Sequence, residues 1–251
     1  DNSIFSQLSN VNHYNFNKLH PAGNVGVQIH HIDSIKNVDD VRFYLSLQDL
    51  SRIGDFFDKK EYPNSRYISV GGNGITGQAI YKILIGTPIK DILRSNLLEL
   101  EHQIISGDVL SGTATTMDKS LYFCDEVLSV ILNNNKREFL GWLLPGLKKY
   151  TLTKTFLSKL ISNKGSELST KKNGSVRTII PMGNWDKVMP MDIMCEYLVK
   201  SILANDIDMM EKLGIYECSP EDFSLCAFAC QSKVEVSKII EDGLDIMENE
   251  A

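Results

Sequence analysis

The sequence has no long apolar run, few cysteines and no excess of positive charge, and each shortage excludes a class of protein. The longest apolar candidate, residues 139–144, stops at Pro145-Gly146, well short of the roughly 18–20 residues that span a bilayer. The cysteines number five, and an odd, scattered set argues against a secreted disulfide framework and favours a reducing compartment. Lys and Arg total 26 against 32 Asp and Glu, a net charge of -6, which is unfavourable for a nucleic-acid binder.

What the sequence does contain is typical of a soluble globular protein. Its 251 residues are 43% hydrophobic and 23% charged, ordinary values for a chain with a packed core. The length predicts one large domain or two to three small ones. The chain begins at Asp1 rather than Met and shows no secretory signal, so we expect a processed product or a fragment without a transmembrane segment.

Charge is unevenly distributed along the chain. Residues 184–251 carry 5 Lys against 15 Asp and Glu, a net charge of -10. Residues 148–177 carry 8 positive charges with only Glu167 against them. The basic run is either a solvated face or a docking surface for anionic lipid or an acidic partner. Both interpretations stay open on the sequence alone.

The hydrophobic pattern predicts three successive segments of mixed α and β structure. In the first, strands at 25–29 and 41–47 precede a helix at 48–57, whose apolar positions are Leu50, Ile53, Phe56 and Phe57. The second resembles the strand–strand–helix–strand–strand rhythm of a β-grasp module, with strands at 66–70, 81–85, 104–108, 121–123 and 127–132 and a helix at 89–94. The third is helical, with helices at 192–203, 206–213 and 234–248 and a helix start at Ser219-Pro220.

A glycine-rich stretch invites a dinucleotide interpretation. Gly72, Gly74 and Gly77, preceded by Gly71, match the bare G-x-G-x-x-G pattern. That fingerprint must open a helix, whose N-terminus binds the phosphate, whereas residues 80–85 look like a strand. We therefore predict a turn between strands rather than a nucleotide site.

Histidines and cysteines are the other candidates for chemistry. His30 and His31 would point to opposite faces of a strand, so that joint metal binding, with or without nearby His20, is disfavoured. Cys218, Cys226 and Cys230 lie within thirteen residues, but they lack the fourth thiolate of a ferredoxin-type run and a neighbouring His to complete a zinc site. Buried structural cysteines are the default interpretation.

Several separate blocks carry a family resemblance. They are residues 20–26 (HPAGNVG), 139–142 (FLGW) with Pro145-Gly146, 181–184 (PMGN), 188–193 (VMPMDI) and the tail from Leu213-Gly214 through Cys218, Asp222 and Leu225-Cys226 to Cys230. Together they resemble the NqrA subunit of the Na+-translocating NADH:quinone oxidoreductase. The resemblance covers essentially the whole chain, which is similar to the C-terminal half of that longer subunit.

The resemblance implies a fold. Relatives of this family, the flavoprotein subunit of respiratory complex I and the cluster-bearing subunit of the Rnf complex, have a Rossmann-like domain, a β-grasp module and a helical domain with iron–sulfur cysteines. The implied fold class is α+β and multidomain. It comprises the tail of a Rossmann-like domain at 1–60, a β-grasp (SLBB-like) module with a β extension at 61–183, and a helical domain at 184–251. In the position of the cluster the chain offers only Cys195 and the incomplete set of three, so the resemblance implies a ferredoxin-type helical domain without a cluster.

The resemblance also implies a role. The expected function is that of a peripheral subunit on the cytoplasmic face of the bacterial inner membrane, implicated in ubiquinone reduction coupled to Na+ export. No tightly bound cofactor and no metal are expected on this chain, ubiquinone is the substrate of the complex, and NADH, FAD, FMN and iron–sulfur centres are expected in other subunits. The implied partners are the other subunits of the six-subunit complex, especially the integral membrane ones, with no nucleic acid.

Alternatives to that role are a stand-alone β-grasp module for ligand binding or scaffolding, and a true electron carrier. No catalytic residue and no cofactor-binding residue is assigned, because a quinone slot is assembled in three dimensions from residues that spacing does not reveal.

Overall fold

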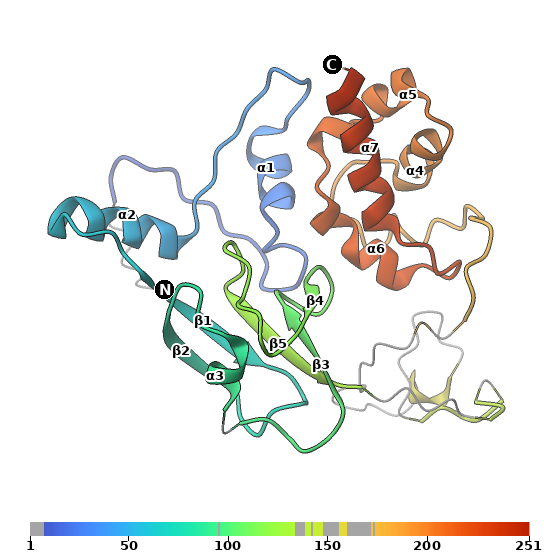
Figure 1. Ribbon diagram of the computed structural model, residues 1–251. Helices are drawn as coiled ribbons and strands as arrows, with labels where there is room; N and C mark the ends of the chain where they lie inside the picture. Colours follow the sequence, from blue (N-terminus) through green and yellow to red (C-terminus); the bar gives the residue numbers. More distant parts are fainter. Residues whose placement is uncertain are drawn as a thin grey trace. The chain divides into compact units, whose positions relative to one another are not determined.

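The computed structural model describes residues 8–94, 96–133, 139–141, 143–147, 156–159, 172 and 174–250 (Figure 1). The chain divides into two compact units. The first joins residues 1–44 to residues 178–251, and the second contains residues 45–177. Among the described residues, every helix is too short or too polar to cross a lipid bilayer.

The first unit is helical. Its α-helices are α1 (Val25–Asp33), α4 (Cys195–Leu203), α5 (Ile207–Lys212), α6 (Ser224–Ala229) and α7 (Val236–Glu250), with the 3-10 turns η3 (Ile215–Glu217) and η4 (Pro220–Phe223). Helix α7 packs against α4, α6 and both 3-10 turns (Figure 1). Val27 of α1 lies in the same hydrophobic core as Leu198 and Ile240. One core therefore joins the two distant parts of the chain.

The predicted helices of this unit are confirmed, but the predicted strand at 25–29 is wrong. Those residues form the start of α1, with Asn24 as the residue before the helix. Val25, Val27 and Ile29 suit a strand by intrinsic preference, yet such preference is weak against tertiary packing. Burial of Val27 among helices decides the conformation.

The second unit is built on a five-stranded sheet. Its strands are β1 (Ser65–Gly71), β2 (Ala79–Leu84), β3 (His102–Ser106), β4 (Thr113–Thr115) and β5 (Val127–Leu132). The order across the sheet is β2-β1-β5-β3-β4. Strands β1 and β5 are parallel, and the other neighbours are antiparallel. In register, Ile68 pairs with Tyr81 and Ile104 with Val130.

Two helices and one 3-10 turn complete the described part of this unit: α2 (Leu47–Lys59), α3 (Ile89–Leu93) and η2 (Leu157–Lys159). Helix α3 buries Ile89 and Leu93 in a core shared with Ile68, Leu128 and Val130 of the sheet. Strand β1 alternates buried and more exposed residues, as expected when one face of a sheet covers a core.

The predicted strands at 66–70, 81–85 and 127–132 and the predicted helices at 48–57 and 89–94 are confirmed within a residue or two. The predicted strand at 121–123 is wrong, because these residues form a turn whose carbonyl oxygens accept hydrogen bonds from Arg66. The predicted strand at 41–47 is wrong as well, since residues 41–46 are assigned to no strand. The short, exposed strand β4 was not predicted.

The two compact units group the chain by contacts, whereas the predicted ranges 1–60, 61–183 and 184–251 are modules in sequence order. Prediction along the sequence yields contiguous ranges, whereas the core of the first unit draws on both parts of the chain. The three ranges remain a prediction about modules.

Candidate functional site

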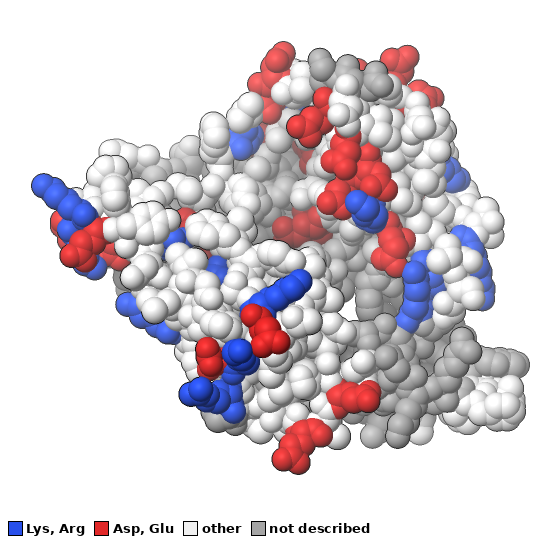
Figure 2. Space-filling view, in the orientation of Figure 1, with Lys and Arg blue, Asp and Glu red and all other residues white. Residues whose placement is uncertain are grey.

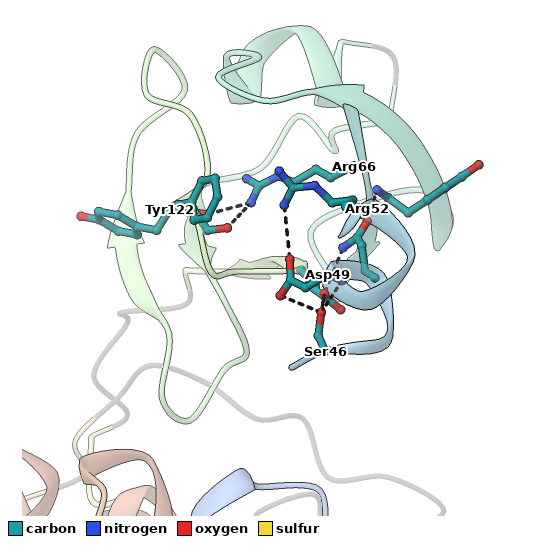
Figure 3. A network of polar contacts seen from close by, with 9 residues as sticks. Ser46, Asp49, Arg52, Arg66 and Tyr122 are labelled. Atoms are coloured by element: carbon teal, nitrogen blue, oxygen red, sulfur yellow. Dashed lines mark hydrogen bonds and ion pairs between the residues drawn. The ribbon is translucent and has the colours of Figure 1, made fainter. Parts of the chain in front are cut away.

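A network of polar side chains ties α2 to the sheet of the second unit (Figure 3). It starts at Ser46, which precedes the helix and accepts a hydrogen bond from the backbone N–H of Asp49 at 3.1 Å. The Ser46 hydroxyl also lies 3.0 Å from Asp49 Oδ2 and 2.9 Å from Glu126 Oε1. A serine followed three residues later by an acid is a known helix-start signal. It could have revealed this end of the network from the sequence.

Gln48 connects α2 to β1 and to the residue that precedes β5. Its Nε2 donates to Glu126 Oε1 at 2.9 Å, and its Oε1 accepts from the backbone N–H of Tyr67 in β1. Glu126 directly precedes β5. One side chain therefore bridges the helix, β1 and the entry to β5, and no spacing rule in the sequence predicts such a contact.

Two arginines lie beside this bridge. Arg52 of α2 is 3.3 Å from Asp49 Oδ1, and its guanidinium lies over the ring of Phe123 at 5.5 Å from the centroid. Arg66 of β1 is buried and donates to the carbonyl oxygens of Tyr122 at 3.0 Å and Phe123 at 2.8 Å. Burial lowers the pKa of Arg66, and the charge of nearby Asp125 opposes that shift. The two arginines thus hold the turn at 121–123 against the helix.

The network positions elements: the Ser46 hydroxyl, which lies against two carboxylates, also accepts the backbone N–H of Asp49 at the start of α2. The buried arginine is occupied by carbonyl oxygens, and the carboxylates of Asp49 and Glu126 are held by neighbouring donors. The role of this network is structural: it fixes α2 on the sheet in one orientation.

The predicted turn at Gly71–Gly77 is confirmed as a connection between antiparallel strands. It joins β1 to β2, and no helix follows it. At Gly72, where φ is +123°, an added Cβ would lie 1.9 Å from the carbonyl oxygen of Val130. The glycines are thus explained by a left-handed backbone and close packing, and the phosphate-binding geometry is not there.

The adjacent histidines lie on α1 rather than on a strand. His30 Nε2 accepts from the backbone N–H of Asp192 at 3.2 Å, and its Nδ1 lies 2.9 Å from Glu217 Oε1. The first contact makes His30 Nε2 the acceptor nitrogen of the ring, and the Glu217 carboxylate lies beside the other nitrogen. His31 Nε2 donates to the carbonyl oxygen of Pro190 at 3.0 Å. Both rings therefore tie α1 to other parts of the first unit.

Four cysteines come together in the core of the first unit. Cys195, Cys218, Cys226 and Cys230 are all buried there, and Cys124 is exposed. Contact with the Cys195 thiol, together with burial, raises the pKa of Cys226. Burial also raises the pKa of Cys218. Such thiols are protonated and unreactive at neutral pH. Within the described residues, no three or more His, Cys, Asp or Glu side chains are arranged to hold a metal ion.

A buried carboxylate, which the sequence did not single out for chemistry, faces the start of α1. Asp222 of η4 is only 2% exposed. An added Cβ on Gly26, in the first turn of α1, would lie 2.0 Å from Asp222 Oδ2. Burial raises the pKa of Asp222, and donors of Asn24, Ser219 and Val27 oppose the increase in part. Only glycine at position 26 leaves room for this carboxylate beside the first turn of α1.

The predicted basic run at 148–177 lies mostly outside the described residues, as do Lys148, Lys149 and Lys171 and also Trp142. The acidic character of residues 184–251 is visible on the structure. Figure 2 shows Asp and Glu side chains gathered over the helices of the first unit.

Two family models match separate parts of the chain. Residues 1–62 match a family model described as the NqrA second alpha/beta domain, and residues 67–117 match one described as the NQRA C-terminal domain, of the SLBB type. The chain is thus one in which an α/β segment is followed by an SLBB-type domain. The two matches meet where α2 joins β1.

Relatives named as the NqrA component of a Na(+)-translocating NADH-quinone reductase match nearly the full chain. The protein from Marinomonas sp. is 34% identical over 96% of this chain and 54% of its own length. Those from Tolumonas auensis and Vibrio atlanticus are 33% and 32% identical over 100% and 98% of this chain. The chain belongs to the NqrA family of Na+-translocating NADH-quinone reductase subunits. It spans about half the length of these relatives.

Proposed function

We propose that this chain works as part of the NqrA subunit of a membrane-bound, Na+-pumping NADH:ubiquinone oxidoreductase. The observation that carries the proposal is the similarity of almost the whole chain to proteins of that family. A stand-alone binding module is disfavoured, because the similarity includes residues 1–62 and the C-terminal helices as well as the sheet.

The proposed place of the chain is peripheral, on the cytoplasmic face of the bacterial inner membrane, in contact with integral membrane subunits. We assign it no tightly bound cofactor. Ubiquinone is the substrate of the complex, and NADH, FAD, FMN and iron–sulfur centres belong to other subunits. The basic run at 148–177 is proposed to dock on a partner or on anionic lipid.

We also propose the finer fold class. The order β2-β1-β5-β3-β4, with β1 parallel to β5 and a helix after the second strand, supports a β-grasp module within 61–183. Residues 1–60 are then the tail of a Rossmann-like domain. Residues 184–251 are then a ferredoxin-type helical domain without a cluster, and the burial of four free thiols in this segment supports that proposal.

The membership in a complex is tested in cells that make the natural NqrA protein. An affinity tag on this protein should recover integral membrane subunits from detergent-solubilised membranes, together with Na+-stimulated NADH:ubiquinone reductase activity. The same tag on an unrelated peripheral membrane protein is the control. Recovery of the tagged protein by itself, without partners or activity, would overturn the proposal.

Whether this chain binds ubiquinone is tested on the chain itself. Titration with a short-chain ubiquinone, followed by Trp142 and Trp185 fluorescence and by calorimetry, separates two outcomes. Saturable binding at micromolar concentrations, about -8 kcal/mol, assigns a quinone site to this chain. Absence of binding leaves the site in the remainder of the subunit or at an interface, and the chain is then a scaffold.

The electron-carrier alternative has its own measurement. Anaerobically purified protein should contain almost no iron, because the four core thiols form no metal-binding group among the described residues. Iron at about four atoms per chain, the content of a [4Fe–4S] cluster, would reverse this interpretation of the cysteines.

A further inference from the structure

The last turn of α1 carries a histidine that connects the helix to the C-terminal part of the first unit. His30 Nε2 accepts from the backbone N–H of Asp192 at 3.2 Å, and His30 Nδ1 lies 2.9 Å from Glu217 Oε1 of η3. The first contact joins residues that are 162 positions apart in the sequence. His30 therefore lies at the joint between residues 1–44 and residues 178–251, which together form one unit.

The two side chains of this pair are largely shielded from water. The exposed fraction is 14% for the His30 side chain and 12% for that of Glu217. A polar group that is shielded from water needs partners within the protein. The two partners of the ring differ in kind, because a carboxylate accepts hydrogen bonds whereas a backbone N–H only donates them.

The contact with Asp192 requires a neutral ring. A ring nitrogen that accepts a hydrogen bond carries no proton, and an imidazolium has N–H groups on both nitrogens. A protonated His30 would therefore turn an N–H group toward the N–H group of Asp192, and this hydrogen bond would be lost. The contact with Glu217 would instead become a charge-assisted one, which is stronger than its neutral counterpart. Proton uptake thus acts oppositely on the two contacts of one ring.

Other titratable groups beside His30 influence its protonation without changing this geometry. The ring of His31 lies edge-on at 5.1 Å between centroids, and a positive His31 would repel a positive His30. The exposed carboxylate of Asp192 attracts a positive ring. Asp33, at the end of the same helix, is paired with Arg42 at 2.8 Å.

We propose that His30 is a pH-sensitive switch at the joint between the two parts of the first unit. At neutral pH the ring holds the backbone of Asp192 and contacts Glu217. On acidification the ring takes up a proton, stays with Glu217 and releases Asp192. This inference is independent of the proposed activity.

The release is local to the segment around residue 192. His31 Nε2 donates to the carbonyl oxygen of Pro190 at 3.0 Å, and an imidazole N–H can do so in the neutral and in the positive form. Met191 and Ile193 are buried in the hydrophobic core of the unit. The neighbouring residues therefore stay in place while the backbone of Asp192 becomes free to exchange with water.

Asp222, which faces the start of the same helix, responds to pH in the opposite sense. Burial raises the pKa of its carboxyl, so the folded state gains stability relative to the unfolded state as pH falls through that raised pKa. A loss of protection at Asp192 on acidification therefore does not come from Asp222. The sign of the pH effect separates the two groups.

Hydrogen–deuterium exchange of the natural NqrA protein tests the switch. The measured exchange rate of the Asp192 amide is divided into its intrinsic rate at each pH, which gives a protection factor that is corrected for the pH dependence of exchange itself. This factor should fall by about tenfold from about pH 7.5 to about pH 5.5, the range in which histidine takes up a proton. Peptides of α7 should keep their protection. A constant factor at Asp192, or an equal fall in α7, would overturn the proposal.

A matched pair of variants assigns the effect to one ring. His30→Gln keeps an oxygen that accepts and an amide group that donates, but it does not titrate, so the protection of Asp192 should no longer depend on pH. His102→Gln removes a histidine from β3 of the second unit and should retain the fall seen in the natural protein. A fall that persists in His30→Gln, or disappears in His102→Gln, would contradict the assignment to His30.

A substitution of Glu217 tests the contact that retains the ring, and it does not depend on the folding of His30→Gln. Glu217→Gln removes a negative charge that favours the imidazolium, so the midpoint of the fall in Asp192 protection should move to lower pH. Glu211→Gln, at an exposed position of α5, controls for the loss of one charge and should leave the midpoint unchanged. A midpoint that stays or moves to higher pH in Glu217→Gln would show that the ring is not retained by this carboxylate, and the switch as proposed would be wrong.

Discussion

Gln48 and Glu126 form the contact through which α2 is held on the sheet. Gln48 Nε2 donates to Glu126 Oε1 at 2.9 Å, and the other end of the same amide accepts from the backbone N–H of Tyr67. Seventy-eight residues separate the two side chains in the sequence. The amide thus fixes a helix, a strand and the start of another strand at one point.

Replacement of Gln48 should loosen this joint. Gln48→Ala removes both hydrogen bonds and should lower the free energy of unfolding by roughly 1–2 kcal/mol, since each intramolecular bond contributes about 1 kcal/mol. Gln78→Ala, at an exposed position between β1 and β2, is the matched control and should change little. Denaturant unfolding of both variants measures the difference. An equal effect of the two substitutions would show that the bridge contributes nothing.

The contact between Gly26 and Asp222 predicts a sharp steric effect. Gly26→Ala places a Cβ 2.0 Å from Asp222 Oδ2, so α1 or η4 must shift, at a cost of about 1–3 kcal/mol. Gly23→Ala is the control, because an added Cβ there meets no atom within 4 Å. Thermal melting of both variants tests the contact, and a Gly26→Ala protein as stable as Gly23→Ala would contradict it.

The sequence predicted the helices and most strands of this chain but not the joints between them. Hydrophobic spacing located α2 and α3 by their helical period, and a continuous apolar run located β5, whose central residues are buried. It failed at 25–29, where packing of Val27 among distant helices overrides β preference, and at 41–47, where a strand pattern stands without a partner. The Gln48 bridge and the close approach of Asp222 to Gly26 depend on contacts of residues 78 and nearly 200 positions apart, which one sequence without an alignment does not reveal.

The buried carboxyl of Asp222 predicts a specific pH dependence of stability. Its pKa in the folded state is raised above 3.8, mainly by burial, so the folded state keeps this proton to higher pH than the unfolded state. The free energy of unfolding should therefore fall as pH rises from about 4 through the raised pKa, and then level off. The Asp222→Asn side chain does not titrate, so this contribution to the pH dependence is absent from the variant.

The measurement is a denaturant titration of both proteins from about pH 4 to about pH 8, a window that begins near the unfolded pKa of an aspartate. The stability of the natural chain minus that of Asp222→Asn should decline with rising pH. Asp208→Asn, at an exposed position of α5, controls for the loss of one negative charge. A difference that increases with pH would show that the folded state favours the ionised carboxylate, and the assignment of a burial-dominated environment would be wrong.

The cysteines predict a simple pattern of thiol reactivity. Cys124 is exposed, while Cys195, Cys218, Cys226 and Cys230 are buried. Burial and mutual contact raise the pKa of Cys218 and Cys226, and the thiolate is the reactive form. Native protein treated with a thiol reagent at neutral pH should therefore show one fast-reacting group, and Cys124→Ser should abolish the fast phase. Denaturant should release all five thiols in the natural chain and four in the variant. A second fast thiol in native protein would mean that the core of the first unit opens readily, and a deficit after denaturation would mean that two of the core cysteines are already linked.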